Sequence, residues 1–240
     1  MNLSRKTSVI LLDIEGTTTP ISFVHETLFP FARAHLKQFL KEHAHDKELH
    51  SDLDMLIKEN HAEKSSGAPA ISQARSCSQA HDYLIWLMDE DRKSPALKAI
   101  QGKIWETGYA GGQLKSVVFT DVPIAFERWQ GEGRRVAIYS SGSVLAQRLL
   151  FRHSEAGDLT RWIEAYFDTA TGAKTEATSY SRIAQKLGVE GHEITFLSDS
   201  SAELDAAVSA GLNVRLAIRT GNRPTSTPVR HPPVFSFDKL

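Results

Sequence analysis

A short apolar run that ends in acidic residues constrains the fold of this chain more than any other feature. Residues 9–12 have the character of a buried strand, and Asp13-Ile14-Glu15-Gly16-Thr17-Thr18 follows them directly. Parallel α/β sheets bind their ligands at the carboxyl ends of their strands. Two carboxylates at such an end serve no packing purpose, and their repulsion favours a bound cation or a shared proton. The stretch therefore predicts a ligand site at the end of the first strand.

Three later apolar runs repeat this strand character. They are residues 136–139, 194–197 and 214–218. Helical patterns separate the later runs, and this order is typical of a parallel sheet with crossover helices. We therefore expect an α/β fold with a Rossmann-like parallel core and helices on both faces.

The segment between the first two runs has a different character, with helical periodicity and few strand signals. We expect helices over residues 26–43, 52–61, 79–88 and 95–105, with Gly108, Gly111 and Gly112 ending the pattern. The resulting prediction is an α/β catalytic core of residues 1–20 and 117–240 and an inserted all-helical cap of residues 21–116. The proline-rich tail, residues 220–240, should form a surface strap anchored by Phe235 and Phe237.

Composition excludes several classes of function. The formal net charge of −1 leaves no basic excess, so we expect neither nucleic acid nor an anionic membrane as a partner. The first strand begins too early for an export signal, and its apolar run is too short to span a bilayer. Cys77, the single cysteine, excludes an internal disulfide and suits a reducing compartment. We expect a cytoplasmic monomer that acts on a small molecule.

Polar residues also follow the second run, where Ser140-Ser141-Gly142-Ser143 precedes a helical pattern over residues 144–151. Hydroxyls and free backbone N–H groups at a helix start can hold a phosphate. The same residue types also cap helices that bind nothing. Ser140 and Ser141 are therefore candidates for phosphate binding, with helix capping as the alternative.

Three charged residues complete the set of candidates. Lys174 follows a short Gly-Ala turn, Asp199 follows the run at 194–197, and Glu203 lies at the start of the next helical pattern. A lone lysine is commonly a solvated surface charge, and acids at a helix start complement its dipole. Asp199 differs from these cases because it lies at a strand end, where it can converge with Asp13.

These four segments resemble the motifs of haloacid dehalogenase-type phosphatases. Asp-Ile-Glu-Gly-Thr-Thr, with Glu as the second acid, is similar to one branch, the enolase-phosphatases of methionine salvage. Segments in the predicted cap and beyond also resemble this branch, namely residues 28–33, 97–105, 108–109 and 121–123. The loop Arg219-Thr220-Gly221-Asn222 departs from it, because it lacks a proline common there. The resemblance spans nearly the whole chain.

The resemblance implies a role for each candidate. Asp13 would be the nucleophile and Glu15 the general acid and base, while Lys174 neutralises charge and binds phosphate together with Ser140 and Ser141. Mg²⁺ would be held by Asp13, by Glu15 through its carbonyl and by Asp199. Glu203 would support this site by orienting Lys174 or by ligating through water.

The resemblance also implies the reaction. The substrate would be 2,3-diketo-5-methylthiopentyl-1-phosphate, a phosphorylated diketone, which is enolised and then dephosphorylated to the acireductone 1,2-dihydroxy-3-keto-5-methylthiopentene through an aspartyl-phosphate. The residues leave the enolisation base open, with Glu15 the first candidate and His25 the second. Two other functions also stay open: another small-metabolite phosphatase of the haloacid dehalogenase type, and a phosphoacceptor signalling domain.

Overall fold

The computed structural model describes residues 8–72, 76–222 and 230–240. It divides into two compact units, one formed by Met1–His25 with Lys115–Leu240 and the other by Glu26–Leu114. The division predicted from the sequence, 1–20 with 117–240 and 21–116, lies within a few residues of these limits. The roles assigned to the two units, catalytic core and cap, stay a prediction.

The larger unit is built on a parallel sheet, as the sequence predicts. Among the described residues the sheet has six strands in the order β3-β2-β1-β4-β5-β6, with β1 between β2 and β4. The strands are β1 (Val9–Leu12), β2 (Arg135–Tyr139), β3 (Ile163–Phe167), β4 (Ile194–Ser198), β5 (Asn213–Ala217) and β6 (Pro233–Val234). The central strands are almost continuously apolar because helices cover both faces of a parallel sheet.

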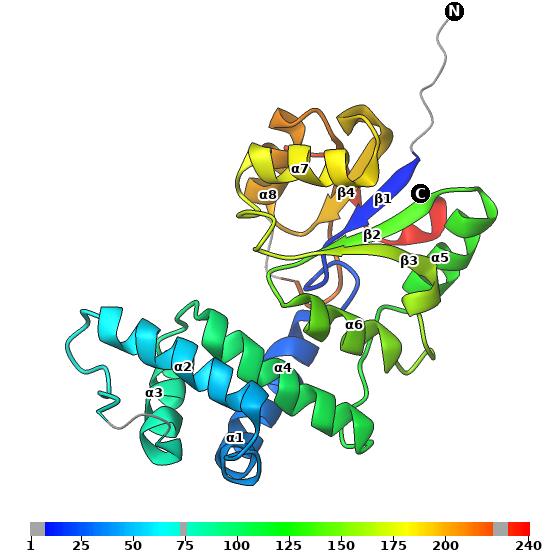
Figure 1. Ribbon diagram of the computed structural model, residues 1–240. Coiled ribbons are helices and arrows are strands. Elements are labelled where there is room, and N and C mark those ends of the chain that lie inside the picture. The colour runs from blue at the N-terminus through cyan, green and yellow to red at the C-terminus, as the bar shows by residue number, and fades with distance from the viewer. Residues whose placement is uncertain (1–7, 73–75, 223–229) are drawn as a thin grey trace, which may run out of the picture. The chain divides into compact units, whose positions relative to one another are not determined.

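Helices lie on both sides of the sheet (Figure 1), so alternate residues along a strand face opposite layers. On one face, Leu11 and Phe196 pack in one core with Ile183 of α7 (Ala177–Leu187) and Leu204 of α8 (Ser201–Ser209). On the other face, α5 (Asp121–Gly131) contacts β2 and α6 (Val144–Arg152) contacts β3. The sheet is therefore held from both sides, and its strand ends are fixed.

The smaller unit is helical. A π-helical segment, η1 (Phe23–Leu28), leads into it, and the helices are α1 (Phe29–Glu42), α2 (Lys47–Ala62), α3 (Cys77–Asp89) and α4 (Pro95–Ala110). The predicted break at Gly108 is wrong, since α4 runs through it. A Cβ on Gly108 would lie 2.5 Å from the ring of Phe31, so this glycine permits close packing of α4 against α1. None of the described helices combines the length and apolar character that crossing a membrane requires.

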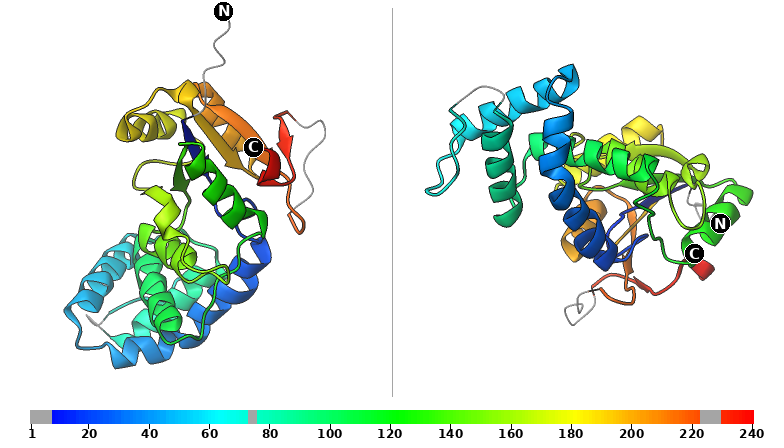
Figure 2. Two further views of the ribbon diagram at one scale, coloured as in Figure 1. Left: turned by 90° about the vertical axis from the view of Figure 1, so that its right-hand side faces the viewer. Right: turned by 90° about the horizontal axis from the view of Figure 1, so that it is seen from below.

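Phe237 anchors the C-terminal segment within the larger unit. This side chain is fully buried beside Trp129 of α5, and Figure 2 shows the last turn, η4 (Phe237–Lys239), alongside that helix. Phe235 is 66% exposed, so the predicted second anchor is wrong. Residues 223–229, which the predicted strap includes, lie outside the described residues.

A buried arginine joins this segment to the turn after β1. Arg219 Nη1 donates to Asp121 Oδ2 at 2.7 Å, and its Nε donates to the Thr17 carbonyl at 3.1 Å. Its guanidinium also lies over the rings of Phe119 and Phe237. The contacts join segments that are 98 and 202 residues apart in the sequence.

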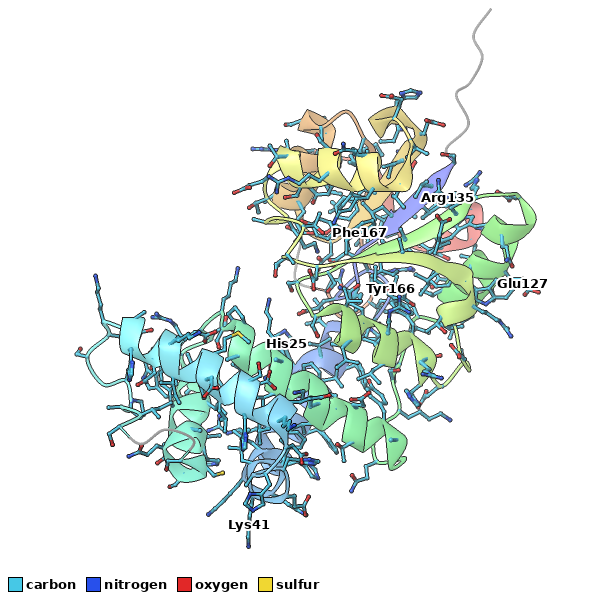
Figure 3. The ribbon with its side chains drawn as sticks, viewed as in Figure 1. His25, Lys41, Glu127, Arg135, Tyr166 and Phe167 are labelled. Atoms are coloured by element: carbon cyan, nitrogen blue, oxygen red, sulfur yellow. The ribbon has the colours of Figure 1, made fainter. Side chains whose placement is uncertain are left out.

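Replacing Arg219 with methionine should destabilise the protein by about 3–5 kcal/mol, because it leaves the buried Asp121 carboxylate without its cation. Urea unfolding measures the loss. Arg135→Met is the matched control, since Arg135 pairs with Glu164 at a partly exposed site, where such a pair contributes about 1 kcal/mol or less. Equal losses for the two variants would contradict this account of Arg219. Figure 3 labels Arg135.

Candidate active site

The end of β1 gathers three of the residues predicted from the sequence. Asp13 is buried there, and Lys174 Nζ lies 2.6 Å from its Oδ1. The same ammonium lies 2.7 Å from Glu203 Oε2. Lys174, whose side chain is 9% exposed, therefore bridges the buried Asp13 carboxylate and the partly buried Glu203 carboxylate. The surface alternative for Lys174 is wrong.

Two tyrosines position the backbone of the Lys174 loop. Tyr180 on α7 donates its hydroxyl to the Lys174 carbonyl at 2.6 Å. Tyr139, at the end of β2, donates to the Gly172 carbonyl at 2.9 Å. Both rings are buried against the sheet, so the loop is fixed to the rigid core. This support explains how a flexible lysine stem reaches a defined position.

Ser198 was not singled out from the sequence. It is the last residue of β4, it is fully buried, and its hydroxyl lies 2.8 Å from Glu203 Oε2 and 3.4 Å from Asp13 Oδ2. A hydroxyl has one proton to donate, and the shorter distance assigns it to Glu203. Only its position between Asp13 and Glu203 marks this serine as part of the site.

The three acids repel one another. Burial, followed by the charges of Asp13 and Glu203, raises the pKa of Asp199 to about 7. Burial also raises the pKa of Glu203. Burial alone would lower the pKa of Lys174, but Asp13 and Glu203 outweigh it, so the pKa is raised and the lysine stays charged. Three carboxylates around one ammonium leave a negative excess that a divalent cation can offset.

The oxygen donors at this strand end suit a cation that keeps several water ligands. Among the described residues, no three or more His, Cys, Asp or Glu side chains are grouped so that they could hold a metal ion by themselves. Mg²⁺ typically takes one or two carboxylates and completes its octahedron with waters and substrate phosphate. Asp13 and Asp199, with the Glu15 carbonyl, offer oxygen donors of this kind. The residues present therefore fit the implied Mg²⁺.

Gly16 makes room for Asp199. Its φ is +67°, and a Cβ at this position would lie 2.8 Å from Asp199 Cγ. The turn around it is closed by the Gly16 N–H, which donates to the Thr19 carbonyl, and by Thr18 Oγ1, which donates to the Asp13 carbonyl. The glycine thus permits both the left-handed backbone and the close approach of the acid.

Gly16→Ala should lower catalytic activity at least about tenfold, because the new methyl group displaces the Asp199 carboxyl from its position beside the turn. Steady-state kinetics with Mg²⁺ titration measures this loss. Gly211→Ala is the matched control: its φ is +83° but nothing lies within 4 Å of the added Cβ, so it carries the same backbone strain without the clash. Comparable activity in the two variants would disprove the steric argument.

Ser140 and Ser141 lie at the neighbouring strand end. Leu12 pairs with Ile138 in the register of β1 and β2, so the turn after β2 lies beside the turn after β1. Ser140 is buried, and its Oγ accepts from the Gly142 N–H at 3.3 Å. The cap of α6 is provided by Ser143, whose hydroxyl accepts from the Ala146 N–H. Helix capping therefore does not account for Ser140.

Glu15 has a different environment from the other acids. Its Oε1 lies 2.7 Å from His25 Nε2, and both side chains are nearly half exposed. His25 lies on the segment η1, as Figure 3 shows. The contact brings the second candidate for the enolisation base beside the first. Glu15 is thus a solvent-accessible carboxylate beside the buried Asp13 cluster.

Comparison with known proteins assigns the family. The model of haloacid dehalogenase-like hydrolases matches residues 7–211. An enolase-phosphatase E1 from Synechococcus elongatus is 49% identical over 92% of this chain and 93% of its own length. Another from Salmo salar is 41% identical over 92% of this chain and 89% of its own. The chain belongs to the enolase-phosphatase E1 family.

Solved structures agree with this assignment. The UTR4 protein of Saccharomyces cerevisiae has 36% sequence identity, a TM-score of 0.80 and coverage of 98% of this chain and 100% of its own. CbbY from Rhodobacter sphaeroides, at 14% identity and a TM-score of 0.58, shares the fold. The family resemblance and the α/β fold class inferred from the sequence are confirmed, and this enolase-phosphatase family member is a phosphatase-type hydrolase.

Proposed function

We propose that this enolase-phosphatase family member converts 2,3-diketo-5-methylthiopentyl-1-phosphate to the acireductone and phosphate, as a step of methionine salvage. The contact of Lys174 with Asp13 at 2.6 Å carries the proposal, since it holds a buried carboxylate ready beside a cation at the strand end. Relatives at 41–49% identity with the name enolase-phosphatase E1 support it.

Phosphate release uses Asp13 as the nucleophile in this proposal. A carboxylate oxygen of Asp13 bonds to phosphorus as the bond from phosphorus to the substrate oxygen breaks, and Glu15 gives that oxygen a proton. Glu15 then takes a proton from the water that attacks the aspartyl-phosphate, which releases phosphate and restores Asp13. Lys174 stabilises the negative charge of the Asp13 carboxylate and the substrate phosphate as they approach each other. Ser140 and Ser141 donate hydrogen bonds to the phosphate oxygens.

Mg²⁺ is the cofactor we propose. Asp13, the Glu15 carbonyl and Asp199 would hold it, and Glu203 would support the site by orienting Lys174. When bound, the ion would neutralise phosphate charge and polarise a substrate carbonyl. Burial, together with the charges of Asp13 and Glu203, raises the pKa of Asp199, and a divalent cation would offset the negative charge of the three acids.

We propose Glu15 as the base for enolisation. This step removes a proton from the carbon next to a substrate carbonyl, so the base must be reachable by substrate. The Glu15 side chain is 42% exposed, whereas that of Asp13 is 7% exposed and engaged by Lys174. His25 holds Glu15 Oε1 and is the second candidate.

A substrate panel tests the function. The purified protein should turn over the diketone phosphate with a kcat/KM at least about a hundredfold above that for common sugar and metabolite phosphates, and a chelator should remove the activity. A flat profile would favour the alternative, another small-metabolite phosphatase of the same superfamily. No phosphate release from any ester would contradict both and favour a phosphoacceptor domain.

We also propose a cytoplasmic monomer without nucleic-acid or membrane partners. The net charge of −1 and the single cysteine are the supporting observations. Sedimentation at micromolar concentration should give one species with the mass of a single chain; a dimer would overturn the monomer proposal.

A further inference from the structure

The side-chain amide of Asn222 has only one acceptable orientation. Its Nδ2 lies 2.8 Å from the Gly16 carbonyl and 3.4 Å from the Ala217 carbonyl. Both neighbours are acceptors, so the NH₂ group must face them and Oδ1 must point the other way. The turn after β1 and the end of β5 together fix this amide.

The amide oxygen that results is buried and faces the acid site. Among the described residues, Asn222 Oδ1 has no hydrogen-bond partner. It lies 3.1 Å from the point where a Cβ on Gly16 would be, and Asp199 Cγ lies 2.8 Å from the same point. The oxygen and Asp199 Cγ therefore cannot be farther apart than the sum of these two distances, a span that one water molecule bridges.

Two acceptors that face each other require a donor between them. A buried amide oxygen without a partner costs about 1–3 kcal/mol, and Asp199 cannot donate to it in the ionised form that holds a cation. A water bound to a cation at Asp199 is a strong donor, because the cation polarises its O–H bonds. Such a water would donate a hydrogen bond to Asn222 Oδ1 and would itself be held in place beside Asp199.

We propose that Asn222 is a positioning residue of the cation site: its Oδ1 accepts a hydrogen bond from a water of the Mg²⁺ shell, while its Nδ2 holds the Gly16 turn. The inference rests on the Mg²⁺ of the proposed function and extends it. Partners of this kind typically contribute ten- to a hundredfold to metal affinity. The residue comes from the loop in which the chain lacks the family's common proline.

Calorimetric titration of the chelated full chain with Mg²⁺ alone tests the proposal. Asn222→Ala should weaken Mg²⁺ binding at least about tenfold. Asn222→Asp should bind within a few-fold of the unmodified chain, because it keeps an oxygen in place. A purely structural role predicts equal losses instead, since both variants lose the donors to Gly16 and Ala217.

Two controls test whether the position of the Asn222 oxygen matters, rather than the loss of any asparagine or the charge added by an aspartate. Asn213→Ala removes an exposed asparagine at the opposite end of β5, where its Nδ2 donates to the His192 carbonyl, and should leave Mg²⁺ affinity unchanged. Asn222→Ala combined with Thr220→Asp adds a carboxylate to the same loop at an exposed position and should stay weak. Restoration by this second acid would mean that charge alone matters and would overturn the proposal.

The remaining outcomes are decisive. Unchanged affinity in Asn222→Ala, or equal weakness in Asn222→Asp, would overturn the role of Oδ1 while leaving the Mg²⁺ site intact. No Mg²⁺ binding by the unmodified chain would overturn the cofactor of the proposed function as well, so the two failures are distinguishable.

Discussion

Asp13→Asn lowers phosphate release by at least about 10⁴-fold while the protein stays folded. An amide cannot attack phosphorus, and the loss of a nucleophile removes a whole reaction path rather than one contact. The fold should persist because Lys174 keeps its contact with Glu203 at 2.7 Å, and Ser198 keeps its hydrogen bond to the same acid. Single-turnover phosphate assays and circular dichroism measure the two properties.

Asp205→Asn is the matched control for this change. Asp205 lies on the same helix as Glu203, but it is exposed and pairs with His231. Its replacement should leave activity within about twofold, as expected for a surface pair. Substantial turnover by Asp13→Asn would remove Asp13 as the nucleophile and shift attention to another carboxylate of the cluster.

Lys174→Met should abolish activity and also destabilise the metal-free protein by about 3–5 kcal/mol. The lysine side chain is 9% exposed and contacts Asp13 and Glu203, so its removal leaves one buried and one partly buried carboxylate close together without a cation. Urea unfolding in the presence of a chelator measures the stability. Mg²⁺ should restore part of it, since the ion replaces some of the missing positive charge.

The double variant Lys174→Met with Glu203→Gln isolates the electrostatic cause. Removing one of the two acids should recover more than about 1 kcal/mol of the loss, because neutral glutamine no longer repels Asp13. Activity should stay absent, since the cation beside the nucleophile is still missing. If the double variant is no more stable than the single one, packing of the lysine stem and not charge is the reason for its burial.

The mostly apolar strands can be predicted from the sequence, whereas the edge strands β3 and β6 cannot. β1, β2, β4 and β5 appear in it because both faces of a parallel strand are buried. The edge strand β3 contains Glu164, which pairs with Arg135 on the surface, so its apolar signal is weak. Helix α5 was also missed, because Pro123 and charged residues obscure its periodicity.

The site divides in the same way. Asp13 and Asp199 could be predicted because strand-end acids converge in any parallel sheet. Ser198, Arg219 and Asn222 could not, since their roles depend on contacts with Asp13, Thr17 and Gly16, which are distant in sequence. In the sequence they are a serine, an arginine and an asparagine, and nothing there distinguishes them from ordinary surface residues.

Trapping the covalent intermediate tests the central claim most directly. The enzyme is mixed with the diketone phosphate and Mg²⁺, quenched in acid within one turnover and digested for mass spectrometry. The proposed mechanism predicts a phosphoryl group on the peptide that contains Asp13, removable by hydroxylamine and absent in Asp13→Asn. Full turnover with no modified peptide at any quench time, or a phosphoryl group on a different residue, would contradict Asp13 as the nucleophile.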